Sequence, residues 1–326
     1  MKPLLRSNVF ALILITFLVF TKLFVSSPLV RLFGYSNFML GDEYILILIP
    51  CILFFIITKA PVKKTLRLNK LSFTNALLII VIAILCQPIS SFLANLAGII
   101  FPNPVPEALS SMGNVSFLFM FFAIAVQPAI CEEAFCRGVV LSGYENQSTA
   151  KAAVINGLIF GMFHLDLNQF FYAFALGIIF TYLVRITNSI FASSLAHVTF
   201  NGIQVALSFA VLKNYDSETV KQAQHQTSSQ IILTLGVLFV MAAACLFLVI
   251  MILQYMDKQN KKNMPEETAP AFNFEQDPEM MYMLNNPIGD VEINEEGITS
   301  YIPLWILIGE FSVLMYLAYV VVPKLN

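Results

Sequence analysis

The stretch VSFLFMFFAIAVQPAICEEAFCRGVVLS, residues 115–142, decides how this chain folds. It is long enough to cross a bilayer, because a spanning helix needs roughly 20 mostly apolar residues. Within this apolar run lie Glu132, Glu133 and Arg137. Charges inside a spanning helix are costly unless they pair or face a functional cavity. The stretch therefore predicts both a membrane helix and a site of chemistry inside it.

The composition extends this interpretation to all 326 residues. Hydrophobic residues make up 58% of the chain and charged residues only 12%, and the mean hydropathy is +0.78. Soluble domains carry about 25% charged residues. We therefore expect an all-α, polytopic membrane bundle of about eight or nine transmembrane helices, with the lipid bilayer as its environment. Basic and aromatic residues are not interleaved, so the sequence gives no support for nucleic-acid binding.

Nine apolar segments are candidates for the spans, and the second and fifth are short. The densest cluster of basic residues lies between the second and third segments, and such loops stay in the cytoplasm. This rule places the N-terminus in the cytoplasm too, and we expect a multi-pass protein of a bacterial plasma membrane. The segments are 9–28, 44–58, 74–100, 115–142, 150–165, 169–185, 188–211, 231–255 and 301–322.

The two glutamates have different surroundings on a helix. Glu133 and Arg137 are four residues apart, so they share one face and can form an ion pair. Glu132 points about 100° away from Glu133 and stays available for another partner. A helix-packing network in which both glutamates share Arg137 is the alternative, but it leaves the buried histidines unexplained.

Two histidines and an asparagine lie in the apolar segments that follow. His164 ends FGMFH (160–164), and His197 opens HVTFN (197–201), which places Asn201 one helical turn later. Either histidine taken alone is more typical of a satisfied core residue. At 1.5 Å per residue, however, Glu132, His164 and His197 lie roughly 14–21 Å from their cytoplasmic turns. The sequence thus predicts that these polar groups converge within the membrane.

These motifs carry a family resemblance. EEAFCR matches an EExxxR motif, FGMFH an FxxxH motif and HVTFN an HxxxN motif, and AFALG (173–177) precedes the third motif. In this order they resemble the CPBP (Abi) family of intramembrane proteases, which includes type II CAAX prenyl endopeptidases of the Rce1 kind and bacteriocin-processing enzymes. The resemblance covers about residues 115–205, less than a third of the chain.

The resemblance implies an endopeptidase that cuts membrane-associated substrates, including lipidated peptides of the CAAX type. It assigns water activation to Glu132 and His164, and oxyanion stabilisation to His197 and Asn201. Glu133 belongs to the same catalytic set, and Arg137 supports it as an ion-pair partner. Peptide hydrolysis requires both functions, since a base must take a proton from water and donors must hold the oxyanion.

A zinc-dependent version of this protease is an alternative. The family is commonly labelled metalloprotease, and Glu132, His164 and His197 are ligand types that Zn²⁺ accepts. No HExxH motif is present and asparagine is a poor zinc ligand, so the sequence leans slightly towards a metal-free mechanism.

Two other classes of membrane protein also bury such residues. A proton-coupled carrier would be expected to show repeat symmetry and broken helices in both halves, and neither is found. A non-catalytic scaffold would not need every motif position filled. Substrate identity and oligomeric state are not readable from the sequence.

The remaining segments complete the predicted domain organisation. We expect N-terminal transmembrane helices at 1–114, a catalytic CPBP-like core at 115–211, and an outer loop with a further helix at 212–255. An irregular cytoplasmic loop at 256–300 follows, since 263–300 holds nine Asp or Glu residues and no Lys or Arg. The last helix, 301–326, contains Glu310, which no motif explains.

Overall fold

The structure, a computed structural model, describes residues 2–104, 115–214, 227–262 and 298–321. These residues form helices joined by short connections, and none of them lies in a strand. Within these described ranges, eight helices are long and apolar enough to cross a membrane, which confirms the predicted all-α, polytopic fold. They are Pro3–Phe33, Tyr35–Thr58, Phe73–Gly98, Phe117–Val140, Leu167–Thr187, Ile190–Val211, Ser228–Lys262 and Ile298–Val321.

The predicted fifth span, 150–165, is the exception. It is the 15-residue helix α10 (Thr149–Phe163), about 22 Å long at 1.5 Å per residue, against a hydrocarbon core of roughly 30 Å. It ends early because Leu165 takes a left-handed φ of 52° and Asp166 then caps the next helix, α11 (Leu167–Thr187). Eight long helices therefore replace the nine predicted spans.

The first two spans are longer than the predicted segments 9–28 and 44–58, because partly polar flanking residues are also helical. Gly34, at φ 80°, separates them, a conformation that glycine adopts without a Cβ clash. Each span contains a π-helical turn. Their parts are α1 (Pro3–Phe20), η1 (Thr21–Val25) and α2 (Ser26–Phe33), then α3 (Tyr35–Glu43), η2 (Tyr44–Leu48) and α4 (Ile49–Thr58).

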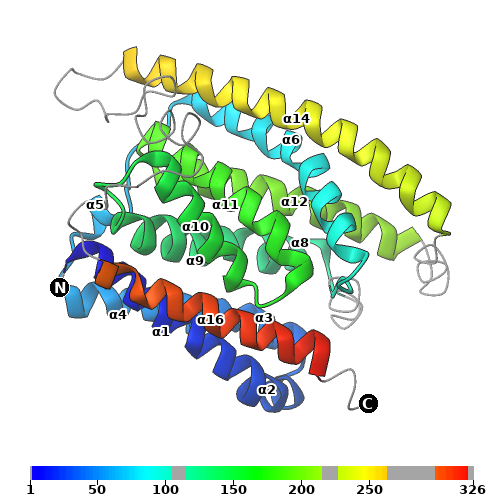
Figure 1. The fold of residues 1–326 in the computed structure, drawn as a ribbon, viewed down its shortest axis with the longest axis horizontal. Coiled ribbons are helices and arrows are strands. Elements are labelled where there is room, and N and C mark those ends of the chain that lie inside the picture. Colours follow the sequence, from blue (N-terminus) through cyan, green and yellow to red (C-terminus); the bar gives the residue numbers. More distant parts are fainter. Residues whose placement is uncertain (1, 105–114, 215–226, 263–297, 322–326) are drawn as a thin grey trace.

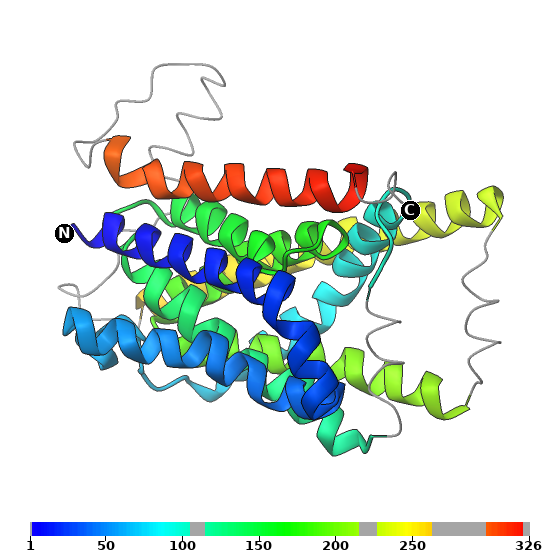
Figure 2. The ribbon, with the colours of Figure 1, turned by 90° about the horizontal axis from the view of Figure 1, so that it is seen from below.

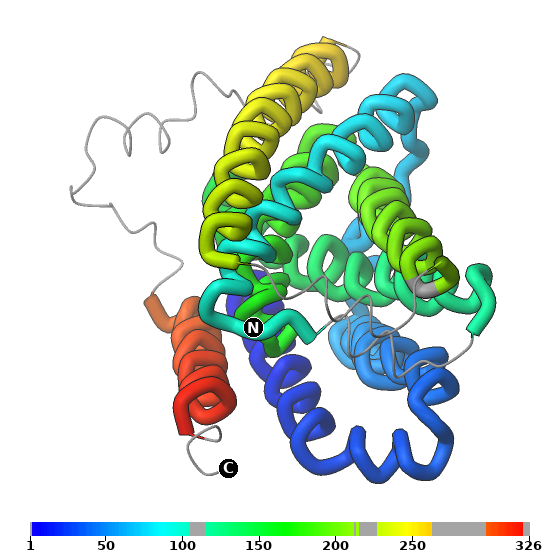
Figure 3. The backbone as a smooth tube through the Cα atoms, turned by 90° about the vertical axis from the view of Figure 1, so that its right-hand side faces the viewer, coloured from blue at the N-terminus to red at the C-terminus, as the bar shows by residue number. Residues whose placement is uncertain are grey.

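The helices are arranged in three layers (Figure 1). The outer layers are α6 (Phe73–Gly98) with α14 (Ser228–Lys262), and the N-terminal helices with α16 (Ile302–Tyr316). Figure 3 shows these two groups on opposite sides of the bundle. Between them lie α10, α11, α12 (Ile190–Asn214) and the composite helix α8 (Phe117–Phe121), η3 (Phe122–Val126), α9 (Gln127–Glu133) and η4 (Ala134–Val140). The short helix α5 (Val62–Thr65) lies in the basic loop.

Burial follows these layers. In the most apolar window of the spans Phe117–Val140 and Leu167–Thr187, 56% of residues are buried, against 11% in Ser228–Lys262. The outer helices expose large apolar side chains such as Phe247 and Trp305, as expected of surfaces that face lipid. The motif-bearing helices therefore form the protected centre of the bundle.

Glycines bring α10 and α11 into close contact. A Cβ atom on Gly157 would lie 2.8 Å from the Phe174 carbonyl oxygen, and one on Gly177 would lie 2.6 Å from Gly157 Cα. Gly161, one turn after Gly157, approaches the Phe170 backbone in the same way. Small residues at such spacing allow helix backbones to approach closely in membranes. This packing fixes the end of α10, where His164 lies.

The two terminal spans pack against each other, as Figure 2 shows for α1 and α16. Thr16 of α1 donates a hydrogen bond of 2.8 Å to Glu310 Oε2 of α16. Glu310 therefore pairs with a neighbouring helix, and this accounts for an acid that no motif explained. The last span also includes η6 (Ile298–Tyr301) and η7 (Leu317–Val321). Most of the predicted acidic loop, from residue 263 to 297, lies outside the described residues, and α14 continues to Lys262.

Candidate active site

Helix α9 and turn η4 carry the two glutamates and the arginine. Arg137 Nη1 donates to Glu133 Oε1 at 2.9 Å, and both side chains are at most 1% exposed. The predicted i,i+4 ion pair is therefore present, and it lies in the interior of the bundle.

Aromatic rings and a carbonyl complete the surroundings of Arg137. Its guanidinium carbon lies 4.3 Å from the centroid of the Phe160 ring and 5.3 Å from that of Phe180. Arg137 Nη2 also donates to the Gly177 carbonyl at 3.3 Å. Cation–π contacts strengthen when they are desolvated. Arg137 is thus fixed by α10 and α11 as well as by Glu133.

Two backbone carbonyls of η4 accept hydrogen bonds from side chains outside it. Asn156 Nδ2 donates to the Cys136 carbonyl at 2.7 Å, and Arg67 Nη1 donates to the Arg137 carbonyl at 3.3 Å. Arg67 also forms an ion pair with Glu145. Burial lowers the pKa of Arg67, and the Glu145 carboxylate opposes this shift. These contacts fix the turn that follows the glutamates.

His197 of α12 lies between the two carboxylates. Its Nδ1 shares a hydrogen bond of 2.9 Å with Glu133 Oε1, and its Nε2 lies 3.9 Å from Glu132 Oε2. A hydrogen bond at one ring nitrogen fixes both the ring orientation and the role of the other nitrogen. Glu133 therefore orients His197, and the second ring nitrogen is directed towards Glu132.

The surroundings of Glu132 differ from those of Glu133. It is 8% exposed, and its Oε2 has no hydrogen-bond partner in the part of the chain that the structure describes. The adjacent glutamates thus divide as the sequence indicated, since Glu133 is engaged by Arg137 and His197 while Glu132 stays available.

His164 follows the last residue of α10. Its Nδ1 lies 2.8 Å from the Phe160 carbonyl oxygen, and its ring packs edge-on against Phe160 with centroids 5.0 Å apart. A carbonyl only accepts hydrogen bonds, so Nδ1 must carry the proton in this contact. In the neutral ring, Nε2 is then an acceptor.

Asn201 lies one turn after His197 on α12. Its Nδ2 donates to the Ile124 carbonyl at 2.8 Å. An amide nitrogen has two hydrogens, and this bond uses one of them. The second hydrogen can be offered to another acceptor.

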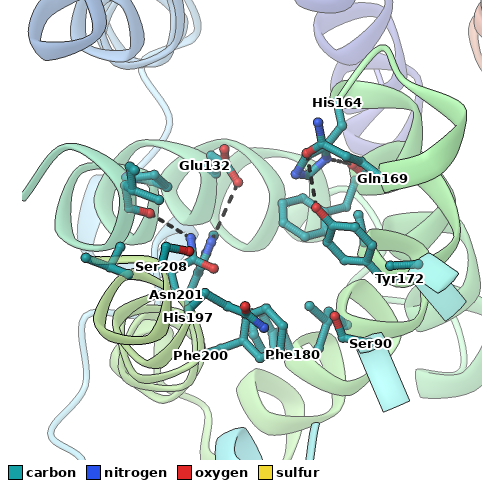
Figure 4. A pocket seen from close by; sticks show the side chains of 18 of the residues that line it. Ser90, Glu132, His164, Gln169, Tyr172, Phe180, His197, Phe200, Asn201 and Ser208 are labelled. Atoms are coloured by element: carbon teal, nitrogen blue, oxygen red, sulfur yellow. Dashed lines mark hydrogen bonds and ion pairs between the residues drawn. The ribbon is translucent and has the colours of Figure 1, made fainter. Parts of the chain in front are cut away.

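One cavity of about 460 Å³ is lined by Glu132, His164, His197 and Asn201. Figure 4 shows His197 and Asn201 on one side of it, with His164 beside Gln169 and Tyr172 on the other. Among the described residues that line it, none is Lys or Arg. The structure thus brings together the four groups that the sequence placed at similar depth, although three different helices supply them.

Several lining residues were not predicted. Glu43 comes from the second span, Gln169 and Tyr172 from the first turns of α11, and Ser90 from α6. Glu43 was detectable as an acid beside an apolar run, but no sequence spacing connects it to residues 132–201. Glu133 and Arg137 do not line the cavity.

The side chains that the structure describes do not form a three-ligand metal site. Among the described residues, no group of three or more His, Cys, Asp or Glu side chains has an arrangement that could hold a metal ion. The predicted set Glu132, His164 and His197 lines one cavity, but His164 lies across it from His197. The zinc-dependent version stays a prediction, and no step below depends on it.

Comparison with known protein families gives a match for the central part of the chain. Residues 114–203 match the family model described as type II CAAX prenyl endopeptidase Rce1-like. This segment is an Rce1-like domain. It contains all three motifs, with Glu132, Glu133, Arg137, His164, His197 and Asn201.

The match covers the centre of the bundle only. The Rce1-like domain extends from the start of the fourth long helix to the first half of α12. Neither the curated proteins nor the solved structures that were compared with the chain gave a match.

Proposed function

We propose that this protein is an intramembrane endopeptidase that hydrolyses peptide bonds of membrane-associated substrates. The observation that carries the proposal is the single cavity lined by Glu132, His164, His197 and Asn201 within the membrane-spanning bundle. The Rce1-like domain supports a protease of the CAAX type. A lipidated peptide with a CAAX-type C-terminus is the substrate class we test first.

Glu132 is the proposed general base. Its Oε2 has no hydrogen-bond partner among the described residues and lies 3.9 Å from His197 Nε2, so it can accept a proton from a water molecule beside His197. His164, with its Nδ1 proton directed to Phe160, offers Nε2 as an acceptor that orients the same water. General-base catalysis of this kind contributes about 10²–10⁴ in rate.

His197 and Asn201 are the proposed donors to the oxyanion. Asn201 retains one amide hydrogen beyond its bond to Ile124. His197 can donate from Nε2 only as an imidazolium, because its Nδ1 is directed to Glu133. Each such donor contributes about 10²–10³ in rate.

We further propose that the N-terminus lies in the cytoplasm of a bacterial cell. The loop between α4 and α6 contains Lys59, Lys63, Lys64 and Lys70, and all four side chains are exposed. Lys and Arg are enriched in cytoplasmic loops of membrane proteins. Attachment of a cysteine-reactive, membrane-impermeant reagent to single cysteines introduced at these positions tests the orientation.

The activity is tested with purified protein in lipid vesicles and a prenylated CAAX peptide. E132Q and H164A should each lower kcat/KM by about 10²–10⁴, measured as release of the C-terminal fragment by mass spectrometry. E310Q is the matched control, because Glu310 is a carboxylate in a spanning helix that bonds to Thr16 and does not line the cavity. Parent-level cleavage by both E132Q and H164A would disprove the proposed mechanism.

A further inference from the structure

The last transmembrane helix reaches the turn that follows His164. We propose that Tyr319, in the π-helical turn η7 at the end of this helix, is a positioning residue that holds His164 in the cavity through a hydrogen bond to Asp166. Tyr319 Oη donates to Asp166 Oδ2 at 2.8 Å. This inference rests on the proposed function, and it gives the C-terminal helix, which lies outside residues 114–203, a role in the reaction.

The turn after His164 is under conformational strain. Leu165 has a φ of 52°, which is unfavourable for a residue with a branched side chain. The next residue, Asp166, is extended, and its Oδ1 accepts from the Gln169 backbone N–H at 2.9 Å, which caps α11. A strained turn persists only where surrounding contacts hold it. The position of His164, directly before this turn, therefore depends on those contacts.

Two spans outside the Rce1-like domain supply such contacts. Lys22 of η1 donates from Nζ to the Leu165 carbonyl at 3.0 Å. Tyr319 bonds to the second carboxylate oxygen of Asp166, the one that does not cap α11. The turn is thus held from the first span and from the last, in addition to its cap.

The helix that carries Tyr319 is itself fixed. Phe311 packs on Phe170 of α11 with ring centroids 5.4 Å apart, and Glu310 accepts the hydrogen bond from Thr16. The Tyr319 ring also lies edge-on to Phe101, at 5.1 Å between centroids. None of these contacts uses the Tyr319 hydroxyl. Removal of Oη alone should therefore leave the C-terminal helix in place and release the turn at Leu165 and Asp166.

The test compares Y319F with Y316F in purified full-length protein. Tyr316 is on the same span but 59% exposed, so it is the matched control. For Y319F, kcat should fall about tenfold with KM changed less than twofold, whereas Y316F should behave as the parent. D166S keeps a side-chain oxygen that can cap α11 but has no second oxygen for Tyr319, so it should have the same effect, and Y319F/D166S should be no worse than either variant alone. Parent-level kcat in Y319F, or additive losses in the double variant, would overturn the proposal.

A second readout separates this proposal from the proposed function. The chain contains three histidines, so ¹³Cε1-labelled histidine gives a spectrum that H164A and H197A assign. The His164 signal should shift in Y319F and stay in place in Y316F, while the His197 signal stays in both. If the parent protein shows no peptidase activity, the proposed function fails, and the His164 signal alone decides the positioning role. An unmoved His164 signal in Y319F would contradict it.

Discussion

The buried pair of Glu133 and Arg137 gives the most discriminating prediction for this protein. R137M removes the cation but keeps an unbranched apolar side chain, and it leaves Glu133 charged in an interior where it is 1% exposed. Breaking a buried ion pair typically costs 3–5 kcal/mol. In micelles the unfolded chain also lies in an apolar environment, so the free-energy difference between the folded and unfolded states changes less than it would in water. We therefore expect R137M to lower the free energy of unfolding by about 3 kcal/mol.

The double variant E133Q/R137M removes both charges at once. Replacing a buried ion pair by uncharged groups is often close to neutral, so stability should return to within about 1 kcal/mol of the parent. Activity should not return, because a neutral amide at Nδ1 is a weaker acceptor than the carboxylate that orients the His197 ring. Stability and catalysis should thus separate in one pair of variants.

Unfolding is measured in mixed micelles by titration with a denaturing detergent, with helix content as the signal, and activity is measured with the vesicle assay above. R31M is the control, since Arg31 is an exposed arginine of the first span and should change stability by less than about 0.5 kcal/mol. If E133Q/R137M is as unstable as R137M, the unpaired charge of Glu133 is not the main cause of the lost stability. If E133Q/R137M has the activity of the parent, Glu133 does not orient His197 for catalysis.

Two further predictions concern the oxyanion donors and the packing of α10. N201A should lower kcat by about 10²–10³ with little effect on KM, because the amide acts on the developing oxyanion. An unchanged rate constant for cleavage in single-turnover experiments would exclude that role. G157A should destabilise the protein by about 1–3 kcal/mol, since its methyl group would meet the Phe174 carbonyl oxygen at 2.8 Å, and G236A, with open space around its Cα, should not. Equal melting temperatures for the two glycine variants would contradict this account.

Much of the architecture followed from local patterns. Apolar runs predicted the spans because lipid leaves a backbone no alternative to internal hydrogen bonding. The prediction was wrong for 150–165, where two residues decide the outcome: Leu165 turns the chain and Asp166 starts α11 before the helix is long enough to span. Apolar composition alone could not show this, since Leu165 is itself apolar and Asp166 lies just beyond the predicted segment.

The candidate site was predictable in its members and less so in its arrangement. The i,i+4 spacing of Glu133 and Arg137 fixes their pairing on any helix. The bond from His197 to Glu133 joins residues 64 positions apart, and the ties from Lys22 and Tyr319 to the His164 turn are longer still. No periodicity in the sequence encodes such contacts.

The sequence alone determined that this is a polytopic helical membrane protein with an acid, two imidazoles and an amide in apolar segments, because hydropathy and helical spacing are local properties. Only the tertiary structure decided that Glu133 is bonded to His197 as well as to Arg137, and that the first and last spans reach the turn after His164. Those outcomes depend on which helices pack together, and hydropathy does not specify the pairs; the close contact of α10 and α11 at Gly157, Gly161 and Gly177 is one such pair.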